Sequence, residues 1–96
     1  MDIFVFLAEV VGTFILCTTI LATGEAVQIG IALAAAISVG SFVSGAHYNP
    51  AVTVMMLAKG RIGLEQLPVY VAGQLLGALL AMIWYKKIPI KSAIHR

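Results

Sequence analysis

The chain has 96 residues, of which 61% are hydrophobic and 10% are charged, and its mean hydropathy is +1.05. A soluble domain is about a quarter charged and less than half apolar, so this chain cannot cover a core with polar surface. A net charge of +2, one cysteine and two histidines exclude a basic nucleic-acid-binding face, a disulfide framework and a zinc site. The composition therefore indicates a small integral membrane protein with one domain, residues 1–96.

Three apolar runs are long enough, or nearly so, to cross a bilayer as helices, which takes about 20 residues. Residues 3–22 form the first run, with Glu9 as its single charge, and residues 27–43 form a shorter, uncharged run. Residues 67–85 form the third, which ends in an aromatic pair and two lysines, as is typical of a membrane boundary. The first run is longer than a signal-peptide core and its leading charge is acidic, which favours a retained helix.

The segment between the second and third runs is apolar but too short to cross. Residues 49–58 begin like a helix, with Asn49 as a favoured N-cap and Pro50 in the first turn. About ten residues at about 1.5 Å each give about 15 Å, half of a bilayer. Two interpretations stay open: a half-helix that enters the membrane and turns back after a buried loop, or an apolar helix at the surface.

Small residues recur every four positions in each long run and favour close packing of helix backbones in lipid. They are Ala8, Gly12, Ala32, Ala36, Gly40, Gly73, Gly77 and Ala81. This spacing predicts a compact helical bundle, and it carries no information about a transported solute.

Three motifs follow one another along the chain. They are AExxGT starting at Ala8, SGAHYNPAVT starting at Ser44, and YxxxQxxGA starting at Tyr70. In this order they resemble the aquaporin, or major intrinsic protein, family, and together they extend over nearly the whole chain. The middle motif, with its Asn-Pro-Ala core, is the most specific of the three.

The resemblance covers one half of that family's fold. It implies an all-helical membrane protein with three transmembrane helices and one re-entrant half-helix, residues 49–58, as in the first of two inverted repeats. The chain has no second Asn-Pro-Ala and lacks the arginine that follows this motif in the second repeat. We therefore expect a half-length member or a fragment of a longer channel, located in the plasma membrane and without a cofactor.

The resemblance also implies how a pore would be lined. Backbone carbonyls would accept hydrogen bonds from passing water, and the asparagine amide would donate at the start of the half-helix. The positive end of the helix dipole there would oppose cations and protons. The implied pore-lining residues are Gly45, Ala46, His47, Asn49, Pro50 and Ala51.

Three further residues receive roles from the same resemblance. Glu9 would accept hydrogen bonds from the loop before the half-helix, with Gln74 as a second brace, although a proton relay is the alternative for an acid at this depth. Ile29 would stand at the constriction, where many water-selective members carry an aromatic residue. A wider constriction predicts passage of water and of small neutral solutes such as glycerol.

Two other classes of protein stay open. The small multidrug resistance exporters are also short, carry a glutamate on their first helix and exchange protons for hydrophobic cations, but they have four full spans. A non-conducting structural subunit is the third class. An enzyme has no support, because the sequence shows no nucleophile with a base, no metal cluster and no phosphate-binding glycine loop.

Half of a pore needs a partner. A second copy in the opposite orientation would make a homo-oligomer, and another chain could instead supply the missing half. Four lysines and arginines follow the third run, while two lie between the half-helix and that run. The positive-inside rule relates orientation to the difference in lysine and arginine between the two sides of the membrane. A difference of four against two is small, so it permits insertion in both orientations.

Overall fold

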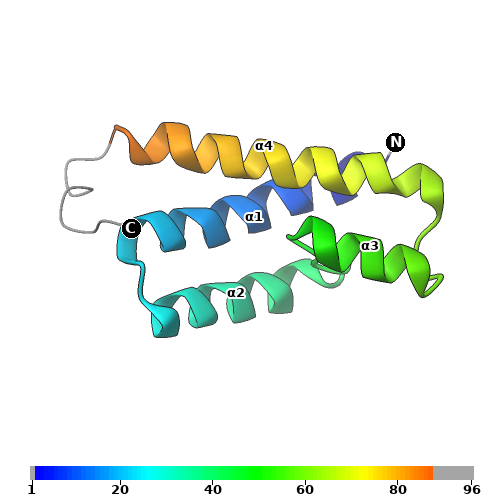
Figure 1. Cartoon of the computed structure of the whole chain (residues 1–96), viewed down its shortest axis with the longest axis horizontal. Helices are drawn as coiled ribbons and strands as arrows, with labels where there is room; N and C mark the ends of the chain where they lie inside the picture. Colours follow the sequence, from blue (N-terminus) through cyan, green and yellow to red (C-terminus); the bar gives the residue numbers. More distant parts are fainter. Residues whose placement is uncertain (1, 88–96) are drawn as a thin grey trace.

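The computed structural model describes residues 2–87, which form four α-helices and one short 3-10 helix (Figure 1). These elements are α1 (Ile3–Thr23), α2 (Ala26–Gly40), α3 (Pro50–Ala58), η1 (Leu64–Gln66) and α4 (Leu67–Tyr85). Strands do not occur among these residues, so the predicted all-helical class is confirmed for the part of the chain described. Lys91, His95 and Arg96 of the sequence lie outside the described residues.

The helices are arranged in two layers (Figure 1). α1 and α4 lie side by side and run in the same direction, and α2 packs against α1 in the opposite direction. α3 contacts α4 and follows α2 in the second layer, so α2 and α3 lie nearly end to end. The loop between them, residues 41–49, brings the start of α3 to the middle of the molecule.

The ends of α1 follow ordinary capping chemistry. The carboxylate of Asp2 accepts hydrogen bonds from the backbone of Phe4 and Val5 at 2.9 and 3.2 Å. Gly24 ends the helix in the left-handed conformation with φ of 62°, which glycine adopts without a steric penalty. The 21 residues between these caps give a length of about 32 Å, enough to cross about 30 Å of hydrocarbon.

Two of the described helices, α1 and the continuous η1–α4 segment, are long and apolar enough to cross a membrane. The second apolar run was expected to be helical over residues 27–43, but α2 ends at Gly40, which leaves 15 helical residues. Beyond a turn at residues 41–44, positive φ angles at Gly45 (84°), Ala46 (55°) and Tyr48 (57°) end any right-handed helix. Hydropathy did not reveal this end, because Phe42 and Val43 continue the apolar run through the turn.

The contact between α1 and α4 depends on glycines. A Cβ atom on Gly73 would lie 2.9 Å from the carbonyl oxygen of Phe6, and one on Gly77 would lie 2.6 Å from that of Val10. Both distances are shorter than a carbon–oxygen contact allows. The backbones of the two helices therefore approach more closely than a side chain at either glycine position would permit. Ala81 continues this face of α4 and is completely buried.

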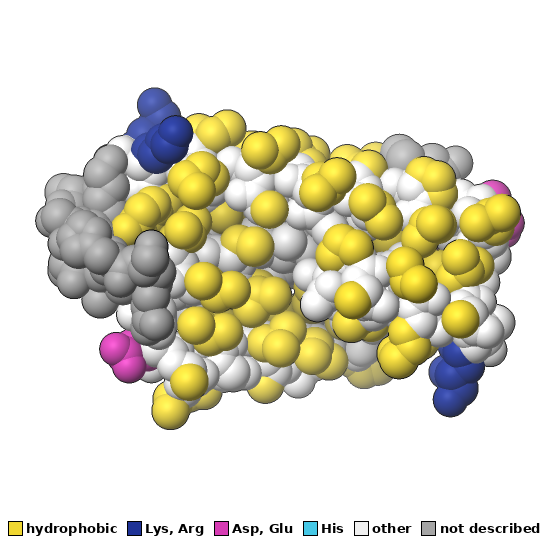
Figure 2. All heavy atoms as spheres, viewed as in Figure 1, with side chains coloured by type: hydrophobic (Ala, Val, Ile, Leu, Met, Phe, Trp, Pro, Cys, Tyr) yellow, Lys and Arg dark blue, Asp and Glu magenta, His cyan; other side chains and the backbone are white. Residues whose placement is uncertain are grey.

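Apolar side chains cover the outside of the molecule. In the face shown in Figure 2 they occupy a broad band, and charged side chains lie only at its two ends. Among the exposed large side chains, Phe42 is 92% exposed, Val39 77% and Phe4 70%. An exposed apolar surface of this extent is rare on soluble monomers and is suited to lipid or to other apolar helices.

Replacing Gly77 by alanine should separate α1 from α4. We expect Gly77→Ala to lower the free energy of unfolding by about 1–3 kcal/mol, the usual cost of overpacking. Denaturation in detergent micelles, followed by circular dichroism, measures this change. Gly30→Ala is the matched control, because its Cβ would have no neighbour within 4 Å. Equal losses of stability in the two variants would contradict the packing described here.

Candidate functional site

The carboxylate of Glu9 lies at the centre of the molecule's main polar cluster and is completely buried. Its Oε2 atom accepts from the Ser44 hydroxyl at 2.7 Å and from the His47 backbone N–H at 3.1 Å. Its Oε1 atom accepts from the Tyr48 backbone N–H at 2.8 Å and from Gln74 Nε2 at 2.9 Å. A carboxylate offers about four lone-pair positions, and here four donors occupy them. Three of these donors belong to the loop between α2 and α3 and the fourth to α4, so the carboxylate joins the loop to both long helices.

A second set of contacts connects α3 and α4 to the same cluster. Gln74, on α4, donates from Nε2 to the Thr53 hydroxyl oxygen at 2.9 Å as well as to Glu9. That hydroxyl, on α3, also lies 2.9 Å from Nδ1 of His47. Thr53 and Gln74 are both buried. Polar side chains from three helices thus fix the position of the loop.

An aromatic contact holds the loop on its α4 side. The rings of His47 and Tyr70 stack with centroids 4.1 Å apart and planes inclined by 14°. The Tyr70 hydroxyl donates to the backbone carbonyl of Ser44 at 2.6 Å. The His47 ring therefore acts as a packed, hydrogen-bonded part of the scaffold.

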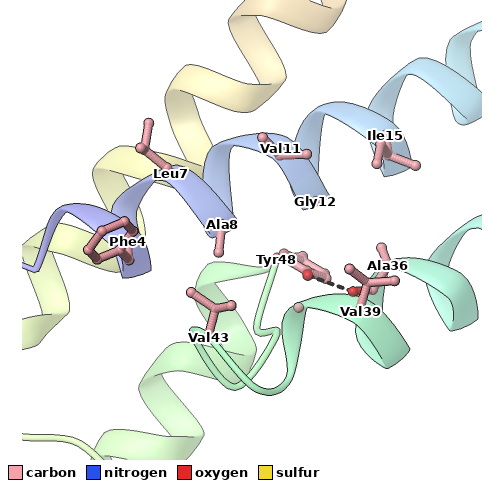
Figure 3. Close-up of a pocket in the computed structure, with 11 residues that line it drawn as sticks. Phe4, Leu7, Ala8, Val11, Gly12, Ile15, Ala36, Val39, Val43 and Tyr48 are labelled. Carbon is pink, nitrogen blue, oxygen red and sulfur yellow. Dashed lines mark hydrogen bonds between the residues drawn. The ribbon is translucent and has the colours of Figure 1, made fainter.

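Tyr48 holds the loop on its α1–α2 side. Its ring fills the space beside Gly12 and Gly40, where a Cβ on either glycine would overlap it. Its hydroxyl donates to the carbonyl of Ala36 at 2.7 Å, as Figure 3 shows. Two of the small residues on α1 and α2 thus make room for an aromatic side chain from the loop.

An apolar groove of about 320 Å³ lies between α1 and α2, with Tyr48 among its lining residues (Figure 3). Its lining residues are Phe4, Leu7, Ala8, Val11, Gly12, Ile15, Ala36, Val39, Gly40, Val43 and Tyr48. The hydroxyl of Tyr48 is bound to Ala36, so this lining offers no free polar side chain that could replace the hydrogen bonds of water.

Backbone donors and acceptors of residues 45–48 differ in whether they are hydrogen-bonded. Every N–H group is bonded inward: that of Gly45 to the Ser41 carbonyl, that of Ala46 to the Ser44 hydroxyl, and the next two to Glu9. None of the four carbonyl oxygens accepts a hydrogen bond from the described part of the chain. The four carbonyls therefore have no hydrogen-bond donor within the described chain; Gly45 is exposed, whereas Ala46, His47 and Tyr48 are buried.

The first turn of α3 continues that surface with a donor. Oδ1 of Asn49 accepts from the backbone N–H of Ala51 at 2.8 Å, which caps the helix, and Pro50 fills its first position. Nδ2 of Asn49 then has no acceptor within residues 2–87. Asn49, Pro50 and Ala51 are all exposed. The loop with the unbonded carbonyls thus leads to an exposed amide donor at the positive end of a helix.

The structure brings together all but one of the predicted site residues. Glu9, Gln74 and the residues of the loop and of the first turn of α3 form one cluster. Ile29 is separate: it is half-buried on α2, eleven positions before Gly40, which is about 16 Å along the helix. A constriction at Ile29 would therefore lie at a different depth from the loop.

Sequence reasoning assigned no role to Ser44, Tyr48, Thr53 or Tyr70, although all four lie in the motifs. Tyr70 and Gln74 are four residues apart on one helix, a spacing that places both on the same face. Thr53 similarly follows the Asn49 cap by four residues. The position of Tyr48 had no local signal, since it depends on two glycines distant in sequence.

Comparison with known protein families gives one match that covers nearly the whole chain. The family model described as "Major intrinsic protein" matches residues 3–93. Among curated proteins, "Glycerol uptake facilitator protein-like 6" of Lactiplantibacillus plantarum is 39% identical over 85 residues, 79% of this chain. "Nodulin-26" of Glycine max is 35% identical over 88 residues, and "Aquaporin NIP1-1" of Zea mays is 45% identical over 58 residues.

These relatives are much longer than the matched region. The match covers 39% of the Lactiplantibacillus protein, 32% of the soybean protein and 21% of the maize protein. The chain thus spans less than half the length of the curated relatives named here. A comparison with solved structures gives no match.

Replacing Glu9 by glutamine should destabilise the loop without a change in size. The side-chain amide of the glutamine has only one acceptor oxygen, and its NH₂ group takes the place of the other carboxylate oxygen. This NH₂ group then faces the donors that bind that oxygen in the wild-type chain. At least one backbone N–H loses its acceptor, at a cost of about 1–3 kcal/mol. We expect the free energy of unfolding of Glu9→Gln in detergent to fall by this amount. Glu25→Gln, at an exposed acid, should leave it unchanged.

Proposed function

We propose, because the chain belongs to the major intrinsic protein family, that it forms half of a membrane channel for passive transport of water and small neutral solutes. In this proposal α1, α2 with its following turn, and α4 cross the membrane, and α3 is a re-entrant half-helix. Residues 1–96 then form one half-repeat with a transport role and no enzymatic activity. The observation that carries the proposal is that the N–H groups of residues 45–48 are all bonded within the chain, while their carbonyls and Nδ2 of Asn49 have no partner among the described residues.

Water crosses a narrow pore only if the wall replaces the hydrogen bonds that each molecule loses. The free carbonyls of residues 45–48 supply acceptors along the loop, and Nδ2 of Asn49 supplies a donor at its end. The α3 N-terminus behind Asn49 adds about half of a positive charge for a full macrodipole. Neutral solutes are unaffected by this potential, whereas cations and protons are opposed by it.

The depth of the loop supports a re-entrant rather than a surface position for α3. Glu9, which binds the loop, lies six residues after the start of α1, about 9 Å inside the helix. Gln74 lies seven residues after the start of α4, at a similar depth. A helix at the surface would not begin beside these two residues. The nine residues of α3 then extend about 14 Å, from that depth back to the end where α1 begins.

The relatives' names support glycerol as one solute and the plasma membrane as the location. The Lactiplantibacillus relative is named a glycerol uptake facilitator, and uptake takes place at the cell boundary. Ile29 is smaller than an aromatic residue and uncharged, which suits a constriction wide enough for glycerol. The lipid bilayer and these solutes are the proposed partners.

A proton-coupled exporter is less consistent with the cluster around Glu9. Such a mechanism needs a carboxylate that binds and releases protons during transport. Four donors already occupy the lone-pair positions of Glu9, so a proton on either oxygen would displace one of them. The carboxylate is better suited to a structural role in a channel.

A substitution at Asn49 tests the proposed exclusion of charge. Asn49→Asp keeps an acceptor oxygen for the helix cap but adds a negative charge. A unit charge about 4 Å from a passing cation contributes about 4 kcal/mol at an effective dielectric constant of about 20, so proton conductance should rise by up to about a thousandfold. Stopped-flow light scattering and a pH-sensitive dye in proteoliposomes measure water and proton flux.

Asn49→Ser is the matched control, because serine also caps the helix but stays neutral. It should leave proton conductance low. Wild-type vesicles that shrink no faster than empty vesicles in an osmotic gradient would contradict the proposed channel, provided that circular dichroism shows the chain to be folded.

A bulkier residue at Ile29 should narrow the proposed constriction. We expect Ile29→Phe to lower glycerol permeability by about tenfold, equivalent to about 1.4 kcal/mol, with a smaller loss for water. Val27→Phe is the control, because Val27 is two positions away and 71% exposed, on a different face of α2. Uptake of labelled glycerol into proteoliposomes measures the effect. Complete exclusion of glycerol by the wild-type chain would contradict the predicted selectivity.

A further inference from the structure

We propose that the ring of His47 carries its proton on Nε2 and offers this N–H group as a hydrogen-bond donor to the oxygen of a passing water or polyol. Thr53 and Gln74 are positioning residues, because their hydrogen bonds decide which ring nitrogen is protonated. This inference rests on the proposed channel function and adds a group that selects the solute to the same site.

The hydrogen bonds around Gln74 can be arranged in only one way. Its Nε2 atom lies 2.9 Å from Oε1 of Glu9 and 2.9 Å from the hydroxyl oxygen of Thr53. A carboxylate oxygen only accepts, so the NH₂ group of Gln74, and not its amide oxygen, must face Glu9. The second proton of this NH₂ group then points to Thr53. The hydroxyl oxygen of Thr53 is therefore an acceptor in that contact.

The hydroxyl of Thr53 has a single proton to donate and two atoms that could accept it. One is Nδ1 of His47 at 2.9 Å, and the other is the backbone carbonyl of Asn49 at 3.4 Å. Hydroxyl donors bond at about 2.5–3.0 Å, so the shorter contact takes the proton. Nδ1 of His47 is then an acceptor and carries no proton. Because a neutral imidazole has one N–H group, the proton is on Nε2.

The Nε2 atom of this buried ring lies beside an exposed part of the loop. The ring stacks on Tyr70, and only 6% of His47 is exposed. A Cβ atom on Gly45, which is exposed, would lie 3.6 Å from Nε2. Within residues 2–87, the fully enclosed side-chain atoms that lack a hydrogen bond are Oγ1 of Thr13, Oγ1 of Thr18 and Oε1 of Gln74. Nε2 of His47 is not one of them, so it keeps an accessible surface beside Gly45.

The depth of the loop determines what this N–H group can contact. No acceptor for Nε2 occurs within residues 2–87, and an N–H group left unbonded in lipid is costly. Polar groups at membrane depth are tolerated against protein or in a water-filled cavity. An oxygen of water or of a solute in the proposed pore supplies the acceptor. Gly45 permits this approach, because a side chain at that position would stand next to Nε2.

This donor changes the set of solutes that the loop can bind. Nε2 of His47 lies near Gly45, and Nδ2 of Asn49 lies at the other end of the loop. The unbonded carbonyls of residues 45–48 belong to the segment between these ends. A molecule whose hydroxyl groups both donate and accept can bond to both kinds of group. Water and small polyols fit this description.

The position of the ring proton tests the first step. His95→Gln leaves His47 as the only histidine, and ¹⁵N-labelled histidine in this variant shows by NMR in micelles which nitrogen bears the proton. We expect the proton on Nε2. Thr53→Val should shift the ratio of the two tautomers toward Nδ1–H by about tenfold, because Nδ1 loses its donor. A proton on Nδ1 in the wild-type ring would overturn the proposal.

Two further variants separate positioning from folding. Thr53→Ser keeps a hydroxyl and should restore the proton to Nε2, even if Thr53→Val unfolds. Thr19→Val is the matched control, since the Thr19 hydroxyl bonds to the Ile15 carbonyl of its own helix at 2.8 Å. It should leave the tautomer unchanged. An equal shift in Thr19→Val and Thr53→Val would overturn the assignment of Thr53 as a positioning residue.

Contact with water tests the second step. In bicelles, the Nε2–H proton should exchange magnetisation with water and not with the methylene protons of lipid chains. Contact with lipid chains, or no contact with water, would overturn the proposed donor.

Solute flux separates this inference from the proposed function. His47→Asn keeps an amide oxygen near the place of Nδ1 but has no atom at that of Nε2, so glycerol permeability in proteoliposomes should fall by about threefold to tenfold. His47→Gln, whose NH₂ group reaches the Nε2 position, should lose less. An Nε2–H group that contacts water in a chain without flux would support this inference and contradict the channel. Rapid flux that is equal in the wild type and in His47→Asn would support the channel and overturn this inference.

Discussion

The structure depends on the hydrogen bonds of one buried carboxylate. An ionised acid in an apolar bundle is costly unless its oxygens are bonded, and a loop at the same depth is costly unless its N–H groups are bonded. Glu9 and the loop satisfy each other, because the backbone N–H groups of His47 and Tyr48 and the hydroxyl of Ser44 are donors to the same carboxylate. Each therefore supplies hydrogen bonds that the other needs at this depth.

The loop of residues 45–48 has bonded N–H groups and unbonded carbonyls. Donors of residues 45–48 are all bonded inside the bundle, whereas their carbonyls have no hydrogen-bond donor in the described chain. The conformation is not relaxed, since the non-glycine residues Ala46 and Tyr48 have φ of 55° and 57°, at a cost of about 1–3 kcal/mol each. Tyr48, packed beside Gly12 and Gly40, and Tyr70, stacked on His47, are the contacts that hold it.

The small residues and the polar residues have complementary tasks in this bundle. Gly73 and Gly77 bring the backbones of α1 and α4 together, which places Gln74 within 2.9 Å of Glu9. Without that approach the amide would not reach the carboxylate, and the connection to Thr53 on α3 would be lost. Close packing, which lipid itself does not drive, is thus a condition for the geometry of the loop.

Local sequence determined much of the fold. The apolar runs determined the all-helical class, and the Asn-Pro pair determined where α3 begins, because helix formation and capping depend on neighbouring residues. Only the tertiary structure decided that α2 ends at Gly40, that Tyr48 fills the space beside two glycines, and that Ile29 lies apart from the loop. The donors to Glu9 come from residues 35 to 65 positions away, and no periodicity within one helix records such contacts. Their selection requires the packed arrangement of all the helices.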